Sequence, residues 1–273
     1  QLVKPQVYQH MHHITSKIIH LHMKDLQKGR PFPEVMQEFL DWCGEDYIFC
    51  TWGPLDLFEL QRNMKYYGKL SMIPGPVTYY DVQKLFAIRY EENHERRALE
   101  FAADKMGIAK KMEFHRALGD AYYTACVLQK IEDEYILPNS SLDVYQNPKS
   151  KREEIHVSYP TYDKFVSREF YSREKAMKDR EVTSTKCPLC HNPAKRKIRW
   201  FMNNSKVYYS ISLCQEHGFV MGKIRLRKTE NNMYYAIKTL TNVSDEEAEE
   251  IRQKREAHRA KKRSRKAEES AKQ

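Results

Sequence analysis

The sequence lacks any long hydrophobic run. No stretch of its 273 residues approaches the roughly 20 consecutive apolar residues that a membrane-spanning helix needs. A secretory signal pattern is also missing, because Lys4, His10, His12 and His13 interrupt any apolar segment near the start. We therefore expect no membrane partner. The length is enough for one large domain or two modest ones.

The chain also lacks an initial methionine. It begins with Gln1 and leads directly into Leu2-Val3-Lys4-Pro5, a pattern that predicts a short strand ended by proline. We therefore expect further residues upstream of this sequence.

Cysteines are few, and half of them fit no metal-ligand pattern. Cys43, Cys50 and Cys126 lie in apolar segments, as is typical of buried thiols in a reducing compartment. This pattern predicts a cytoplasmic location. The formal net charge of +10 favours polyanionic partners.

The first half of the chain alternates helical and strand patterns, which indicates an α/β fold. A helix is predicted over Phe32–Cys43, and the apolar run 47–52 predicts a central strand covered on both faces. Asp56 follows in W-G-P-L-D, on the first turn of the next helix. Open α/β sheets bind ligands at this position, just past the carboxyl end of a strand. An ordinary first-turn acid, stabilised by the helix dipole, is the alternative.

A second candidate site lies in F-H-R-A-L-G-D-A, residues 114–121. Apolar residues recur with helical spacing from Ala117 onwards. Asp120 lies at the inner edge of this stripe, where a carboxylate is costly without a cation or donor, and His115 directly precedes the helix. This pair is the minimum set of groups for metal-assisted hydrolysis. A surface histidine and a capping aspartate remain the alternative on spacing alone.

Together the two motifs resemble those of a known family. W-G-x-x-D after a strand, followed about sixty residues later by H-x-x-x-x-D on a helix, resembles the DEDDh superfamily of 3′–5′ exonucleases. The L-V-K-P, I-T-S-K-I and T-W-G-P-L-D segments are most similar to its enhanced-RNAi and KapD-like branch. The resemblance extends over about residues 1–136 and implies an RNase-H-like fold.

The resemblance also implies roles for individual residues. Asp56 and Asp120 would bind the divalent ions, Mg²⁺ or Mn²⁺, that clamp the scissile phosphate and orient a water molecule. His115 would be the general base that deprotonates this water. Trp52, the first residue of the W-G-P-L-D motif, would contact the nucleic acid. We expect the domain to extend over residues 1–137.

One part of the family pattern is absent. The first motif is an Asp-x-Glu on the first strand, and no such triplet precedes Asp56 in this sequence; Asp245-Glu246-Glu247 has this form but lies at a charged helix start. We therefore expect an exonuclease domain without its N-terminal strands. Two hypotheses follow: a metal-dependent 3′–5′ exonuclease of single-stranded ends, RNA favoured over DNA, or a noncatalytic nucleic-acid-binding protein with a degenerate nuclease domain.

The second half contains a metal-ligand pattern. Cys187 and Cys190 form one pair, and Cys214 and His217 form another, which together give the Cys₃His set of a closed structural Zn²⁺ site. Strand patterns between and after the pairs predict two hairpins, the first with its turn at residues 203–205. We expect a polar connector over residues 138–184 and a zinc ribbon over residues 185–241.

Basic and aromatic residues mark the ribbon and the C-terminus. Arg199 and Tyr208 combine charge with a stacking surface, as is typical of modules that bind single-stranded RNA or DNA. Ser244-Asp-Glu-Glu247 predicts a capping box that starts a basic helical tail over residues 242–273. From residue 251 the tail has ten Lys or Arg against three Glu, and we expect Lys261, Lys262 and Arg263 to contact phosphates.

Overall fold

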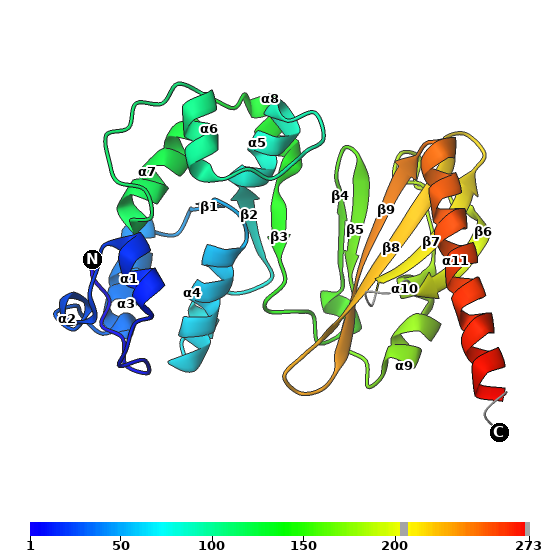
Figure 1. Ribbon diagram of the computed structural model, residues 1–273, viewed down its shortest axis with the longest axis horizontal. Coiled ribbons are helices and arrows are strands. Elements are labelled where there is room, and N and C mark those ends of the chain that lie inside the picture. Colours follow the sequence, from blue (N-terminus) through cyan, green and yellow to red (C-terminus); the bar gives the residue numbers. More distant parts are fainter. Residues whose placement is uncertain (203–206, 271–273) are drawn as a thin grey trace. The chain divides into compact units, whose positions relative to one another are not determined.

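The computed structural model describes residues 1–202 and 207–270, and for residues 261–263 and 265–270 it gives the helical backbone alone. The chain divides into two compact units, Gln1–Gln146 and Asn147–Gln273 (Figure 1). Both units contain helices and strands, so the predicted mixed α/β class is confirmed. No helix in the described residues is long and apolar enough to cross a membrane.

The first unit combines a small mixed sheet with short helices. Its strands are β1 (Phe49–Thr51), β2 (Val77–Asp81) and β3 (Ser141–Asp143), in the order β1-β2-β3. β1 runs parallel to β2, and β3 runs antiparallel to β2. The α-helices are α1 (His13–Ile19), α2 (Met23–Leu26), α3 (Phe32–Cys43), α4 (Leu55–Tyr66), α5 (Val82–Tyr90), α6 (Leu99–Lys105), α7 (Ala117–Leu128) and α8 (Asp133–Ile136).

The predicted helix over Phe32–Cys43 is confirmed as α3, but the expected central strand is wrong. β1 is only three residues long and lies at the edge of the sheet, and Cys50 in it is exposed. Tyr47 and Ile48, which precede β1, are 38% and 47% exposed, and no strand in the described part of the chain pairs with the outer edge of β1. The predicted N-terminal strand is reduced to one bridge, between Val3 and Arg30.

Two apolar clusters hold this unit together. Helices α5, α6 and α7 bury Val82, Phe86, Ala102, Tyr123 and Val127, among others. Helices α3 and α4 bury a second cluster against β2, which includes Met36, Leu57, Met64, Val77 and Tyr79. Hydrophobic burial of this kind contributes roughly 25 cal/mol for each Å² of apolar surface removed from water.

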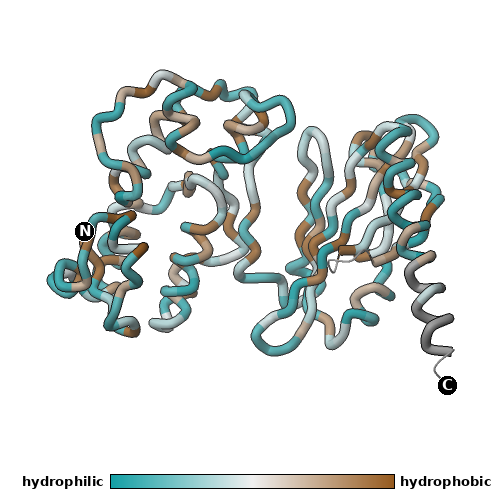
Figure 2. Tube along the Cα trace, in the orientation of Figure 1, coloured by the Kyte–Doolittle hydropathy of each residue, from teal (hydrophilic) through white to brown (hydrophobic). Residues whose placement is uncertain are grey.

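The second unit is built on one six-stranded antiparallel sheet. The strand order is β4-β5-β9-β8-β7-β6. The bounds are β4 (Ile155–Ser158), β5 (Tyr162–Val166), β6 (Lys195–Met202), β7 (Val207–Cys214), β8 (Gly218–Lys228) and β9 (Tyr234–Val243). Buried residues alternate with more exposed ones along β8 and β9, because successive side chains of a strand point to opposite faces. Hydrophobic and polar residues occur along these strands (Figure 2).

The predicted connector differs from the structure. Residues 155–158 and 162–166 are strands β4 and β5, and β5 pairs with β9. The fully buried Val166 and the nearly buried Phe165 show that this segment is part of the core. The segment has many polar residues, so the alternation of apolar and polar residues that predicts a strand is weak in it. The Cys/His motif is therefore attached to a larger sheet than the predicted ribbon of residues 185–241.

Helices cover the two faces of this sheet differently. On one face, α9 (Arg173–Lys178) and α10 (Arg180–Thr183) pack Ala176 and Val182 against Phe165, Ile224 and Ala236. On the opposite face, α11 (Asp245–Ser270) packs Ala248 and Ile251 against Ile198 and Ile211.

Helix α11 starts as the sequence predicts. The backbone N–H of Ser244 donates to the Glu247 carboxylate at 2.9 Å, and the Glu247 N–H donates to Ser244 Oγ at 3.2 Å. This reciprocal pair confirms the capping box. The side chains of Lys261, Lys262 and Arg263, and the predicted turn at residues 203–205, lie outside the described residues.

Candidate functional site

Asp56 lies where a strand gives way to a helix. β1 ends at Thr51, whose Oγ1 donates to the carbonyl of Gly53 at 2.6 Å. Gly53 has φ +93°, a conformation that favours glycine, and a Cβ there would meet Gln83 Oε1 at 3.2 Å. This turn places Asp56 in the first turn of α4, where the helix dipole stabilises a negative charge.

His115 and Asp120 are joined by a local hydrogen bond. The backbone N–H of His115 donates to Asp120 Oδ1 at 3.0 Å, across the start of α7. Gly119 allows the loop to approach this closely, because a Cβ there would lie 2.2 Å from the carbonyl oxygen of Glu113. The buried Tyr123 fixes the same loop, since its hydroxyl bonds both the N–H and the carbonyl of Met112. The five-residue spacing therefore does bring the two residues together.

The electrostatics link the two motifs. Although the Asp56 side chain is exposed at the surface, desolvation by neighbouring groups raises the pKa of its carboxyl above its usual value, and the charge of Asp120 raises this pKa further. Two carboxylates from helices α4 and α7 therefore repel one another in the absence of a cation. A divalent ion between them would relieve this repulsion, which is a common property of carboxylate metal sites.

A third carboxylate lies at the same edge of the sheet. Asp81 is the last residue of β2 and pairs with Thr51, the last residue of the parallel strand β1. It therefore lies at the carboxyl end of the strand next to β1. It is 2% exposed, accepts a bond from the Lys84 N–H at 3.0 Å and pairs with Arg96 at 2.8 Å. The bond from Lys84 makes Asp81 the N-cap of α5. With the Arg96 ion pair on the other oxygen, both carboxylate oxygens are occupied.

Trp52 is half-buried beside this edge. Its ring contacts the core residue Phe86 with a centroid distance of 6.1 Å, and its Nε1 donates to the carbonyl of Arg97 at 3.2 Å. Both contacts serve the fold of the first unit. Contact between Trp52 and nucleic acid therefore stays a prediction.

The raised pKa of Asp56 gives a testable pH dependence. Because the folded pKa lies above the unfolded value of 3.8, ionisation of Asp56 costs stability at neutral pH, and this cost disappears below both values. Asp56→Asn should therefore raise the free energy of unfolding at pH 7 and leave it unchanged at acidic pH. Chemical denaturation across this pH range measures the effect.

A matched control and a metal titration sharpen this experiment. Asp46→Asn removes the same charge from an exposed site outside α4 and α7 and should not reproduce the pH dependence. Added Mn²⁺ should raise the melting temperature of the wild type but not of Asp56→Asn, because a ligand that binds only the folded state stabilises it. A destabilised Asp56→Asn protein at pH 7, or equal Mn²⁺ shifts in both proteins, would contradict this interpretation.

In the second unit, the four predicted ligands converge. The ligand atoms of Cys187, Cys190, Cys214 and His217 all lie within 4.8 Å of one another. The sulfurs of Cys190 and Cys214 are 3.6 Å apart, and His217 Nδ1 lies 3.7 Å from the Cys187 sulfur. Three thiols and one imidazole nitrogen at these separations can surround a single metal ion.

Local backbone geometry prepares this cluster. The Cys187 N–H donates to the Asn192 carbonyl at 2.9 Å, and this bond closes the first pair into a knuckle. Backbone N–H groups of Glu216 and then His217 lower the pKa of the Cys214 thiol to about 6, which favours the thiolate that a metal requires. His191, which could compete as a ligand on sequence grounds, lies instead beside Asp163 at 3.6 Å.

Asn242 is a supporting residue that the sequence pattern did not indicate. It lies in β9, and its Nδ2 donates to the His217 carbonyl at 3.2 Å and lies 3.7 Å from the Cys187 sulfur. It therefore connects the two knuckles, as residues behind metal ligands commonly do. Only the pairing of β9 with β8 brings it there, so no local motif marks it.

The two predicted binding residues of this unit differ in exposure. Arg199 is exposed on β6, whereas Tyr208 is half-buried and packs against the core under α9 and α10. The structure therefore leaves Arg199 accessible to a ligand and uses much of the Tyr208 ring for packing.

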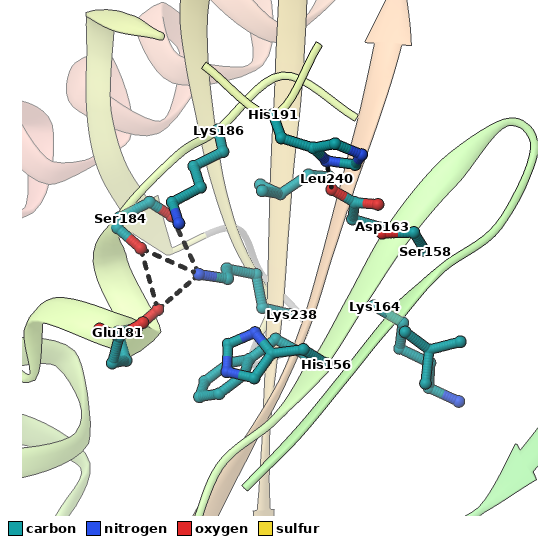
Figure 3. Close-up of a pocket in the computed structure, with 12 residues that line it drawn as sticks. His156, Ser158, Asp163, Lys164, Glu181, Ser184, Lys186, His191, Lys238 and Leu240 are labelled. Carbon is teal, nitrogen blue, oxygen red and sulfur yellow. Dashed lines mark hydrogen bonds and ion pairs between the residues drawn. The ribbon is translucent and has the colours of Figure 1, made fainter. Parts of the chain in front are cut away.

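A hollow of about 230 Å³ lies between the sheet and the segment after α10 (Figure 3). Lys238 at its base donates to the carbonyls of Glu181 and Ser184, and burial lowers its pKa to about 8. These bonds satisfy the last turn of α10. The His191 ring stands beside Asp163 at the other side of the hollow. Lys238 is thus a structural cation whose hydrogen bonds hold α10 to β9.

Comparison with known proteins identifies one domain. Residues 1–128 match the RNase_T family, which is described as exonuclease. No curated protein and no solved structure matches the chain. The match confirms the exonuclease resemblance and does not test the narrower enhanced-RNAi and KapD-like branch. The first unit therefore carries an exonuclease-family domain, which indicates a nuclease function and a nucleic-acid substrate.

Proposed function

We propose that the chain is a metal-dependent 3′–5′ exonuclease that hydrolyses single-stranded ends, with RNA favoured over DNA. The observation that carries this proposal is the meeting of the two motifs. Asp56 on α4 and Asp120 on α7 are close enough for one charge to raise the pKa of the other, and His115 is hydrogen-bonded to Asp120 through its backbone.

The residues present fit a divalent cation. Two mutually repelling carboxylates at the end of β1 offer the hard oxygen ligands that Mg²⁺ and Mn²⁺ prefer. The Asp-x-Glu triplet at residues 245–247 has another role, because Glu247 is used in the capping box of α11. Asp56 and Asp120 would therefore be the ligands that this sequence supplies.

Each residue has a distinct part in the proposed reaction. Mg²⁺ or Mn²⁺ held by Asp56 and Asp120 would supply charge stabilisation to the scissile phosphate and would lower the pKa of the attacking water. His115, exposed beside Asp120, accepts the proton from that water. Asp120 orients the His115 segment through the backbone N–H, and the loop fixed by Gly119 and Tyr123 preserves this geometry.

Four further parts of the proposal concern the substrate, the direction, the location and the second metal. The RNA preference and the 3′–5′ direction follow from the resemblance to the enhanced-RNAi branch. A cytoplasmic location is supported by the three cysteines outside the Cys₃His cluster, Cys43, Cys50 and Cys126, which form no disulfide. The Cys₃His cluster would hold a structural Zn²⁺, because four protein ligands leave no open position for substrate.

A second candidate function is noncatalytic nucleic-acid binding with a degenerate nuclease domain. The incomplete carboxylate set favours it, as does the exposed edge strand β1. In that case the second unit and the basic tail would account for the interaction with nucleic acid.

An assay with end-labelled oligonucleotides distinguishes the two. The purified chain in Mn²⁺ should shorten a 5′-labelled single-stranded RNA stepwise, release a 3′ label at once and leave a circular RNA intact. A DNA of the same sequence should be shortened more slowly. Binding without any shortening would instead support the noncatalytic function, and internal cuts in the circular RNA would exclude an exonuclease.

A further inference from the structure

The face of the second sheet that carries α11 is covered only in part. Side chains of Ile211, Phe219 and Met221 lie under α11 at one end of β7 and β8. Tyr209 on β7 borders this cluster. Farther along, the side chains on this face include Lys223, Arg225 and Arg227 on β8, and Ile237 and Thr239 on β9. We call these six residues the basic face.

The basic face carries an uncompensated positive charge. Arg225 and Arg227 are exposed and Lys223 is half-buried. None of the three forms an ion pair with an acid in the residues that the structure describes. Strands β7, β8 and β9 contain no Asp or Glu, and the Asp163 of β5 points to the opposite face, where it lines the hollow with Lys238. The charge therefore lacks a counterpart within this sheet.

The same face offers surfaces for planar groups. Lys223 Nζ lies 6.0 Å from the centre of the half-buried Tyr209 ring, its partner on the neighbouring strand. A shallow hollow of about 170 Å³ is bounded by Lys223, Arg225, Ile237 and Thr239. It combines two cationic side chains with an apolar floor.

We propose that the basic face binds single-stranded nucleic acid. Successive cations on one face of β8 are spaced about 7 Å apart along the strand, which forms a row that a phosphodiester backbone can follow. Tyr209 and the apolar floor between Ile237 and Thr239 provide contact surfaces for unpaired bases. A duplex hides its bases and would use the charge alone.

This inference extends the proposed function, because it gives the same class of substrate a second contact outside the nuclease domain. It also assigns the binding to residues other than Arg199 and Tyr208, which lie away from this row. The face is present whether or not residues 1–128 are catalytically active.

The test is a binding measurement on the full chain carrying His115→Ala and Asp120→Ala, without added divalent ions. Fluorescence anisotropy of a 5′-labelled 20-mer oligouridylate reports the affinity. Replacing Lys223, Arg225 and Arg227 by Ala should weaken binding at least about tenfold at low salt. It should also reduce the slope of log affinity against log salt by about 2, at roughly 0.7 for each lost phosphate contact.

The matched control removes the same charge from the other face of the same sheet. Lys175, Lys178 and Arg180 are exposed on α9 and α10, and their replacement by Ala should change the affinity by less than about threefold. Coincident thermal melts of both triple variants would show that each is folded. Tyr209→Ala should weaken binding to the single strand without changing the salt slope.

The outcomes separate this proposal from the nuclease proposal. Equal losses of affinity in the two triple variants would overturn the basic face as a single-strand site. So would binding of a duplex, or of dextran sulfate, with the same affinity as the single strand. Such a result would leave the shortening assay unaffected, since that assay measures cleavage. Conversely, the wild-type chain could fail to shorten RNA while the substitutions in the basic face still weaken its binding to single-stranded RNA. That result would support this inference and not the nuclease proposal.

Discussion

His115→Ala is expected to slow RNA shortening by about 10²–10⁴-fold, the usual contribution of a general base. Asp120→Asn should reduce the rate at least as much, because it removes a charge that the metal requires. The amide of the variant keeps an oxygen at the position of Oδ1, which still accepts the 3.0 Å bond from the His115 N–H. Loss of activity in Asp120→Asn would therefore report the lost charge and not a displaced loop.

The kinetics and a control define this test. Single-turnover shortening of a 5′-labelled RNA in Mn²⁺ measures the rate, and Asp104→Asn removes an equal charge from the neighbouring helix α6, where Asp104 pairs with Lys110 on the surface. We expect Asp104→Asn to retain the wild-type rate. Comparable rates in Asp120→Asn and the wild type would mean that the two motifs are not the catalytic site.

The sequence predicted these candidate residues because each motif is local. His115 and Asp120 are five positions apart, so one loop and one helical turn determine their relation. Asp56 follows the end of a strand, a position that requires only one strand and one turn to be recognised. The metal knuckles are equally short.

What the sequence did not predict depends on long-range pairing. The hydrophobic run at residues 47–52 is compatible with a central strand, and only the absence of a partner along the outer edge of β1 in the described residues leaves it exposed. Strands β4 and β5 are short and polar, so their place beside β9 follows from the completed sheet. The position of Asn242 behind the metal cluster and the grouping of the basic face also depend on long-range pairing, because both require β8 to pair with β9.

Removal of the metal from the Cys₃His cluster is expected to have the largest effect on stability. The cluster joins the segment before β6, the β7–β8 turn and, through Asn242, strand β9. Structural zinc binding contributes about 10–16 kcal/mol to folding in small metal-dependent modules. The six-stranded sheet has its own hydrophobic core, so loss of the metal should reduce its free energy of unfolding by less than this. Cys214→Ser should therefore lower the melting temperature by an amount on the order of 10 °C or more.

Zinc content and thermal melts measured together make this prediction specific. The wild type should contain about one zinc per chain by elemental analysis, and Cys214→Ser should contain much less. Cys50→Ser, which changes an exposed thiol of β1 outside the cluster, should leave both the zinc content and the melting temperature unchanged. A zinc-free wild type, or equal melting temperatures of Cys214→Ser and wild type, would contradict a structural metal. The convergent thiols would then be stabilised by the backbone bonds and the core of Val220 and Leu240 alone.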